Sequence, residues 1–296
     1  MAPELPALPG VRHAHHDLAT RVRVHVAEAG PADGPPVLCL HGWPQHWWMW
    51  RGVIPLLAER HRLICPDLRG FGWSDAPPSG YDKENMATDV LALLDAMGLE
   101  RVRLIGHDWG GWIGFIMSVR APERISRYLA LNIPHLWGKP NPKTLLGIWR
   151  FWYQWVMATP GLGPHLVGKR DFAGFLLRRI DPGGIWTDEE RAAFTEPIRE
   201  PDRTRATVQL YRTFIVREFM AVAAGRYKDE RLTVPTRLLF GTQDFAVSSA
   251  FLGDGDTSAF ADDFQIELVP DTGHYIAEQR PDLVNDRALE FMRDAA

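Results

Sequence analysis

Cysteine is nearly absent from this sequence: its 296 residues include only Cys39 and Cys65. Both lie inside short apolar segments that predict buried strands, so we expect two free thiols in the core and no disulfide. Free core thiols are typical of proteins that work in a reducing compartment. We therefore predict a cytoplasmic location.

Long apolar runs are also missing, because no stretch approaches the roughly 18 uninterrupted apolar residues of a membrane span. The first residues show no basic segment followed by an apolar run, so we expect no signal peptide. An excess of basic residues is missing as well, since 33 Lys and Arg face 37 Asp and Glu. This balance argues against nucleic acid or an anionic membrane as a partner.

Metal-ligand patterns are scarce. His13, His15 and His16 stand close together, but their alternation is more typical of an edge strand than of a metal site. We predict that the protein uses no metal and no cofactor. The composition, 46% apolar and 24% charged, is that of an ordinary globular protein. It leaves both a monomer and a homodimer open.

What the sequence does contain is a regular succession of strand and helix signals. Short apolar or alternating segments predict strands at 13–18, 21–27, 37–40, 62–66, 101–105, 127–132, 235–241 and 265–269. Helical spacing of apolar residues predicts helices at 50–59, 83–97, 112–119 and 281–293. The first two strands predict an antiparallel hairpin. The alternation after them predicts a mostly parallel sheet flanked by helices, which is an α/β fold.

One long stretch interrupts this alternation. Between about residues 134 and 230 the signals are helical, at 145–157 and 188–225, with Gly- and Pro-rich breaks at 161–164 and 181–184. The segment 145–157 is apolar on almost every side, so we expect it to be packed on two faces. We predict a helical lid inserted after the sixth strand. The expected parts are a core at 1–133, the lid at 134–230, and the rest of the core at 231–296.

The strand at 101–105 is joined to the helix at 112–119 by Gly-His-Asp-Trp-Gly-Gly. So short a connection forces Asp108 into a sharp bend, and glycines around it supply the room that the bend needs. The bend lifts the carboxylate above the sheet edge and aims helix N–H groups at it. We expect these groups to favour its charged form. Asp108 is thus a candidate nucleophile.

Two further polar residues follow later strands. Asp244 comes four residues after Phe240, and His274 comes five residues after Val269. Ligands of an open parallel sheet bind at the carboxyl ends of its strands. A histidine held by a carboxylate can deprotonate water. Each residue alone could be a turn or capping residue, but the order of nucleophile, acid and histidine favours a catalytic role.

The sequence resembles the epoxide hydrolases of the α/β-hydrolase fold over nearly its whole length. The matching pieces are His41-Gly42-Trp43-Pro44, the segment 106–111 around Asp108, and Gly273-His274. The resemblance implies that the first piece forms an oxyanion hole and that the Trp43–Pro44 bond is cis. It also implies that the N–H groups of Trp43 and Trp109 face the carbonyl oxygen of an ester on Asp108.

The same resemblance implies two tyrosines in the lid, one in a Tyr-Gln pair and one in a Tyr-Arg pair. Tyr153-Gln154 and Tyr211-Arg212 match these pairs, although either tyrosine could be a packing residue. Phenols with a pKa of about 10 stay protonated at neutral pH and can donate to the leaving oxygen of an epoxide. Asp108 is then expected to form an ester, which water activated by His274 hydrolyses to a vicinal diol.

All twelve tryptophans lie between Trp43 and Trp186, so we expect an apolar, aromatic pocket and a small hydrophobic epoxide as substrate. A haloalkane dehalogenase shares the Asp nucleophile and a following tryptophan but needs no pair of proton donors. Fluoroacetate dehalogenases resemble the segment 41–45 but carry Arg where this chain has Trp109. An esterase requires Ser at position 108. A ligand sensor with this fold is expected to lack a catalytic residue, and none is missing here.

Overall fold

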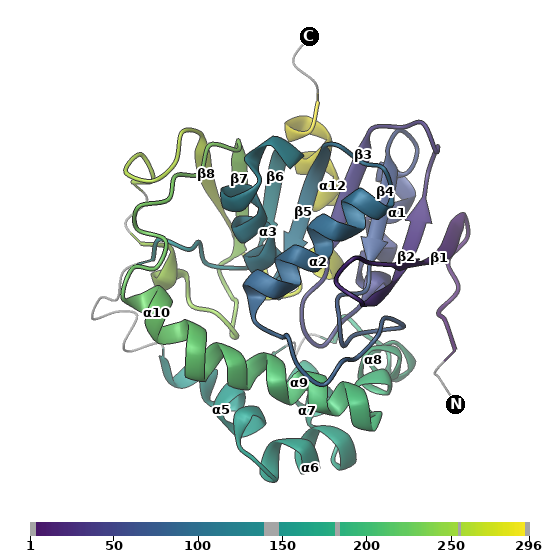
Figure 1. The fold of residues 1–296 in the computed structure, drawn as a ribbon, viewed down its shortest axis with the longest axis vertical. Coiled ribbons are helices and arrows are strands. Elements are labelled where there is room, and N and C mark those ends of the chain that lie inside the picture. Colours follow the sequence, from purple (N-terminus) through teal and green to yellow (C-terminus); the bar gives the residue numbers. More distant parts are fainter. Residues whose placement is uncertain (1–3, 139–147, 181–183, 254–255, 294–296) are drawn as a thin grey trace.

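The computed structural model describes residues 4–138, 148–180, 184–253 and 256–293. Its centre is an eight-stranded sheet in the order β1-β2-β4-β3-β5-β6-β7-β8 (Figure 1). The strands are β1 Val11–Asp17, β2 Arg23–Ala29, β3 Pro36–Leu40, β4 Arg62–Pro66, β5 Val102–His107, β6 Ile125–Leu131, β7 Thr236–Gly241 and β8 Phe264–Val269. The β1–β2 and β2–β4 pairs are antiparallel, and the pairs from β4 to β8 are parallel. The predicted α/β fold that opens on a hairpin is confirmed.

Helices cover both faces of this sheet. In Figure 1, α2 (Lys83–Ala96) and α3 (Trp109–Arg120) lie in front of it and α12 (Pro281–Phe291) lies behind it. The short helices α1 (Ile54–Leu57) and α11 (Ile276–Gln279) contact α12. Because helices cover both faces of the sheet, neither face of the central strands meets water. This explains why these strands are apolar throughout instead of alternating between apolar and polar residues.

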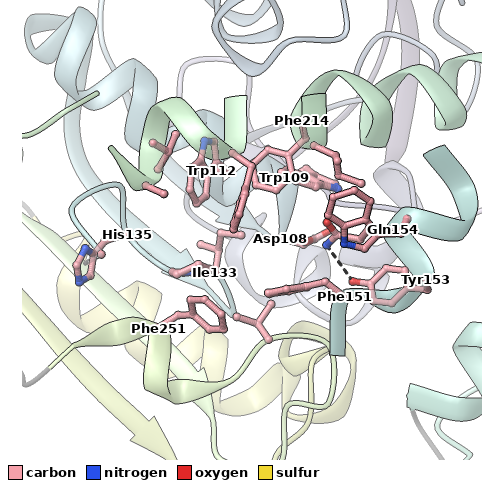
Figure 2. A pocket seen from close by; sticks show the side chains of 18 residues that line it. Asp108, Trp109, Trp112, Ile133, His135, Phe151, Tyr153, Gln154, Phe214 and Phe251 are labelled. Atoms are coloured by element: carbon pink, nitrogen blue, oxygen red, sulfur yellow. Dashed lines mark hydrogen bonds between the residues drawn. The ribbon is translucent and has the colours of Figure 1, made fainter. Parts of the chain in front are cut away.

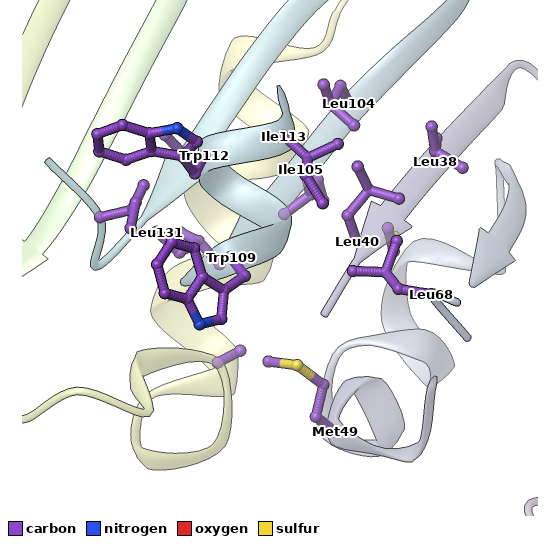
Figure 3. Packing of buried hydrophobic residues seen from close by; sticks show 14 of the residues in the cluster. Leu38, Leu40, Met49, Leu68, Leu104, Ile105, Trp109, Trp112, Ile113 and Leu131 are labelled. Carbon is purple, nitrogen blue, oxygen red and sulfur yellow. The ribbon is translucent and has the colours of Figure 1, made fainter. Parts of the chain in front are cut away.

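The central strands β3 and β5 lie within the hydrophobic core. Every residue of β5 is buried, and Figure 3 shows Leu104 and Ile105 beside Ile113 of α3. Cys39 in β3 and Cys65 in β4 are buried and free, as predicted. A core packed on both sides fixes the ends of these strands, and the candidate site lies just beyond them.

A group of helices connects β6 to β7, and Figure 1 shows it gathered at one end of the sheet. We call this group the lid. Its elements are a 3₁₀ turn Ile148–Phe151, α5 Trp152–Ala158, α6 Leu162–Lys169, α7 Phe172–Ile180, α8 Asp188–Thr195, a 3₁₀ turn Pro197–Arg199, α9 Pro201–Thr213, a π-helical turn Phe214–Glu218 and α10 Phe219–Ala223. Helices after the sixth strand were expected. None of the helices in the described ranges is long and apolar enough to cross a membrane.

One prediction about the lid is shifted and another is wrong. The break expected at 161–164 lies at 159–161, between α5 and α6: Gly161, with a positive φ of 77°, precedes α6, and Pro164 stands in its first turn. Proline needs no N–H partner there. Of the break expected at 181–184, residues 181–183 fall outside the described ranges. The segment 145–157, of which 145–147 fall outside the described residues, is not covered on two sides: Trp149 and Trp155 are each 59% exposed. Its buried face carries Tyr153, Gln154 and Met157.

The histidines near the chain start lie on β1, which is the edge strand that their alternation predicted. His13 bonds to His25 across the hairpin, with 3.0 Å between ring nitrogens. In the part of the chain that the structure describes, no group of three or more His, Cys, Asp or Glu side chains is arranged to hold a metal ion.

Candidate active site

The sheet register brings the predicted residues to one edge. Leu40 of β3 pairs with Gly106 of β5, and His107 of β5 pairs with Leu131 of β6. Further along, Gly241 of β7 pairs with Val269 of β8. Parallel strands end on the same side, so the residues that follow these positions meet above the sheet.

Asp108 occupies the bend between β5 and α3. Its φ of 49° and ψ of −123° are rare for a residue with a side chain. The surrounding backbone leaves no room for larger neighbours: a Cβ on Gly110 would lie 2.4 Å from the carbonyl oxygen of Leu40. A Cβ on Gly42 would lie 2.4 Å from the Cβ of Asp108. The predicted strained bend is therefore present and is packed against the loop after β3.

The two carboxylate oxygens of Asp108 have different surroundings. Oδ2 accepts a hydrogen bond from the backbone N–H of Trp43 at 2.9 Å, and the backbone N–H of Trp109 also donates to the carboxylate. Oδ1 lies 3.9 Å from Nε2 of His274. One oxygen is thus held by the backbone, and the other faces the imidazole.

The surroundings of Asp108 act on its pKa in opposite directions. Burial raises the pKa of Asp108 above its ordinary value, and His274 and the N–H groups of Trp43 and Trp109 only partly oppose this. The expected backbone donors are present and, as expected, each favours the ionised form by lowering the pKa of Asp108. Removal from water outweighs the donors.

The loop after β3 is held from within. The Trp43–Pro44 peptide bond is cis, as the resemblance implied. Nε2 of His41 accepts from the N–H of Leu68 at 2.9 Å, so Nδ1 carries the proton and donates to the carbonyl of Gly42 at 2.9 Å. Burial lowers the pKa of His41 to about 4. His41 is therefore a neutral brace of the loop backbone that presents the Trp43 N–H.

His274 and Asp244 form a hydrogen-bonded pair. Nδ1 of His274 donates to Oδ2 of Asp244 at 2.8 Å, and the other oxygen of Asp244 accepts from the N–H of Val247 at 2.8 Å. Burial lowers the pKa of His274, but the charge and hydrogen bond of Asp244 and the charge of Asp108 outweigh it. The pKa of His274 is therefore raised, and its Nε2 points to the side of Asp108.

Asn132 is a part of the site that sequence reasoning missed. It follows β6 directly, has a positive φ of 46°, and donates from Nδ2 to Oδ2 of Asp244 at 2.8 Å and to the carbonyl of Gly273 at 3.2 Å. Its amide thus ties the acid to the histidine loop. The available signal was its place at a strand end, which it shares with Asp108, Asp244 and His274.

The two lid tyrosines lie together at the site. The ring centroids of Tyr153 in α5 and Tyr211 in α9 are 6.1 Å apart. The Tyr211 ring also meets the rings of Trp43 at 5.5 Å and Trp109 at 5.8 Å, edge to face. Burial raises the pKa of both phenols above the ordinary value of 10.0. Both therefore keep their protons well above neutral pH.

A cavity of about 290 Å³ leads to Asp108 and Tyr153. Figure 2 shows Gln154 beside Tyr153, where its Nε2 lies 3.5 Å from the phenol oxygen. Most of the remaining lining is apolar or aromatic: Trp109, Trp112, Ile133, Pro134, Phe151, Trp155, Phe214, Ile215, Phe219, Val222, Ala223, Val247 and Phe251, with His135 and Gly138. The predicted aromatic pocket between lid and sheet edge is confirmed.

Comparison with known proteins places the chain in a family. Residues 35–281 match the model of the α/β-hydrolase fold family. The chain is 33% identical to a soluble epoxide hydrolase of Corynebacterium sp. (strain C12), over 94% of this chain and 96% of the relative. The solved structure of the epoxide hydrolase CorEH without ligand matches with a TM-score of 0.81 and 29% identity, over 95% of this chain and 98% of that one.

The chain belongs to the α/β-hydrolase fold family and, within it, to the epoxide hydrolases. The fold alone does not decide the reaction. A structure from Salmonella enterica described as a candidate acyltransferase matches equally well, with a TM-score of 0.83 and 27% identity over 98% of this chain and 97% of that one.

Proposed function

We propose that this protein opens hydrophobic epoxides to vicinal diols through a covalent ester on Asp108. The observation that carries the proposal is the pair of buried phenols, Tyr153 and Tyr211, next to an aspartate on a strained bend. When an epoxide ring opens, the leaving group is an alkoxide that stays attached to the same molecule. Ring opening is therefore slow without a proton donor. Two protonated phenols supply that proton.

In the first step, Oδ1 of Asp108 attacks an epoxide carbon while a phenol protonates the ring oxygen. The N–H groups of Trp43 and Trp109 form the oxyanion hole: they hold the oxygen that becomes the ester carbonyl. The raised pKa of Asp108 fits a nucleophile that is stripped of water and therefore more reactive toward carbon. The C–O bond of the epoxide breaks, and its oxygen becomes a hydroxyl.

In the second step, His274 acts as the base. A water molecule between its Nε2 and the ester, a gap of 3.9 Å to Oδ1 in the free enzyme, loses a proton and attacks the carbonyl carbon. Alkylation removes the charge of Asp108, which is one of the influences that raise the pKa of His274. Once the ester exists, the imidazole is more easily neutral and can act as the base, and Asp244 stabilises the imidazolium that forms.

The tetrahedral intermediate then collapses: the bond between the carbonyl carbon and the ester oxygen breaks, and that oxygen leaves with the diol and takes the proton of the imidazolium. The new carboxyl group of Asp108 gives its proton back to the phenolate, which restores the starting state.

The cavity supports a substrate with an apolar substituent. Its lining offers few polar groups apart from Asp108, Tyr153, Gln154 and His135. An aryl or alkyl group on the epoxide can fill the aromatic part, so that burial of apolar surface contributes to binding.

The proposed function is tested with a panel of aryl, alkyl and fatty epoxides beside matched 1-haloalkanes. We expect diol formation from epoxides and no halide release. Halide release with no diol would support a dehalogenase, which has no use for the two phenols. No turnover of either class would support a ligand-binding role.

A further inference from the structure

Lys83 is an unusual residue for its position. It is the first residue of α2, yet its side chain is completely buried. A positive charge near a helix N-terminus is disfavoured by the helix dipole, and a buried ammonium loses its hydration. Local helix formation therefore does not explain why a lysine is buried at this position. The explanation lies in the groups that its ammonium contacts.

Those partners come from the lid. Nζ of Lys83 donates to Oε2 of Glu218 at 2.9 Å and to the carbonyl of Leu210 at 3.0 Å, and it lies 3.5 Å from the carbonyl of Tyr81. Oε1 of Glu218 accepts from the backbone N–H of Lys83 at 2.9 Å. The carboxylate of Glu218 in the lid thus forms an ion pair with the ammonium of Lys83. It also accepts a hydrogen bond from a backbone N–H at the start of α2 that has no partner within the helix.

The π-helical turn is what delivers Glu218. The turn spans Phe214–Glu218 and follows α9 without interruption. It accommodates one residue more than an α-helical turn, and without that residue the side chains beyond it would be rotated by about 100°. π-helical turns are rare in proteins, and those that occur are often found at functional sites.

The same ammonium also reaches the site. It lies 4.5 Å from the ring centroid of Trp109, whose backbone N–H donates to Asp108. The carbonyl that it holds belongs to Leu210, the residue before Tyr211. The Tyr211 ring in turn rests edge-on against Trp109. A single cation therefore contacts the indole that Tyr211 packs against and holds the backbone carbonyl next to Tyr211.

We propose that the Lys83–Glu218 pair is a positioning device for ring opening: it holds the turn of the lid that carries Tyr211 against Trp109, and so keeps this phenol over Asp108. This inference rests on the proposed function, because it assigns the pair to the step that needs the phenol. Neither residue touches the reacting atoms. The pair acts through Tyr211.

Lys83→Met removes the ammonium while keeping an unbranched side chain. We expect ester formation on Asp108 to slow by about 10- to 100-fold, as for a small displacement of a catalytic group. Quenching a single turnover at successive times and measuring the adduct by mass spectrometry gives this rate. The hydrolysis of the ester needs no phenol and should keep its wild-type rate. We also expect faster hydrogen exchange in residues 207–218 of the free protein.

Arg203→Met is the matched control. Arg203 also ties α9 to the core, through the carbonyl of Gly72 at 2.7 Å, but it stands eight residues, about 12 Å, from Tyr211. The control should form the ester at close to the wild-type rate. If Lys83→Met is folded and forms the ester as fast as this control, the pair is merely structural and the proposal is wrong.

Lys83→Met leaves Glu218 buried without its partner and could prevent folding. The double variant Lys83→Met/Glu218→Leu removes both charges together, which proteins often tolerate well, and it carries the same expectation. If the wild-type protein forms no ester with any epoxide, the proposed function fails, and hydrogen exchange alone decides on the pair. Exchange over 207–218 that is faster in Lys83→Met than in Arg203→Met then supports only the structural part of the inference, that the pair holds the turn carrying Tyr211, and unchanged exchange overturns that part too.

Discussion

The sheet edge and the lid each supply part of the site, and they hold their residues by different means. Asp108, Asp244 and His274 follow strands whose register is fixed by continuous backbone ladders. Tyr153 and Tyr211 stand on helices that meet the core through separate side-chain contacts. One such contact runs from Nε1 of Trp43 to Oγ1 of Thr207 at 3.4 Å. The base and nucleophile are thus placed by the fold, whereas the phenols are placed by local contacts.

The difference coincides with the two proposed chemical steps. Ring opening requires both regions, because the nucleophile comes from the sheet edge and the proton from the lid. Ester hydrolysis requires the sheet edge alone. Changes in each region should therefore separate the two steps, and the following expectations run from the largest effect to the smallest.

Replacing the base should stall only the second step. We expect His274→Gln to lower kcat by about 10³–10⁴-fold, because no other group is placed to activate water. Ester formation should continue, so that mass spectrometry after mixing with an epoxide finds the adduct on the peptide that contains Asp108. His165→Gln, an exposed change on α6, is the control. Wild-type turnover without any adduct in His274→Gln would rule out the two-step scheme.

Replacing the phenols should slow only the first step. Tyr153→Phe and Tyr211→Phe should each slow ester formation by about 10- to 100-fold, and the double variant by about 10²–10⁴-fold. Rapid-quench measurement of the adduct gives this rate directly. Tyr227→Phe is the control, since the phenol of Tyr227 donates to Oε1 of Glu84 at 2.6 Å. A double variant with unchanged ester formation would reduce both lid tyrosines to packing residues.

We expect kcat/KM to fall at acid pH, because of Asp108 at the sheet edge, and not at alkaline pH. Asp108 must be ionised to attack, and its pKa is raised, so kcat/KM should fall by about tenfold per pH unit below a pKa that lies above 3.8. The phenols must be protonated, and their pKa is raised above 10.0. Steady-state measurements from pH 4 to pH 10 should therefore show no alkaline loss. An alkaline limb near pH 8 or 9 that disappears in the phenylalanine variants would contradict this.

Asn132→Gly should have the smallest effect. Glycine tolerates the positive φ of this position, so the change removes the amide without backbone strain. A hydrogen bond to a charged group contributes about 1.5–3 kcal/mol, and Asp244 keeps its bonds to His274 and Val247, so we expect the lower end of this range, a slowing of ester hydrolysis by roughly tenfold. Ester formation should be nearly unchanged. Equal slowing of both steps would mean that Asn132 supports the fold of the edge rather than the acid–histidine pair.

Sequence reasoning succeeded best at the sheet edge. The strands are short apolar segments, and Asp108, Asp244 and His274 could be placed because each follows one of them. Asn132 obeys the same rule but was missed, since a single asparagine after a strand looks like any turn residue. The raised pKa of Asp108 could not be predicted either, because it depends on how completely the folded chain buries this carboxylate.

In the lid the sequence was informative about tyrosines and poor about packing. Tyr153 and Tyr211 could be placed by resemblance, but apolar content alone wrongly predicted that 145–157 is covered on two faces. The Lys83–Glu218 pair joins residues that are 135 positions apart in sequence, and a π-helical turn brings the glutamate into reach. Neither the pairing nor the turn leaves a periodic signal in the sequence.

The source of the oxygen in the product tests the central proposal most directly. A single turnover in ¹⁸O-water, with enzyme in excess over epoxide, distinguishes attack by Asp108 from direct attack by water. In the proposed route the first diol takes its new oxygen from Oδ1 of Asp108, and water refills the carboxylate afterwards. We predict a mostly unlabelled diol and one ¹⁸O atom in the peptide that contains Asp108. Quantitative label in the first-turnover diol, with none in Asp108, would contradict the account and make Asp108 a general base.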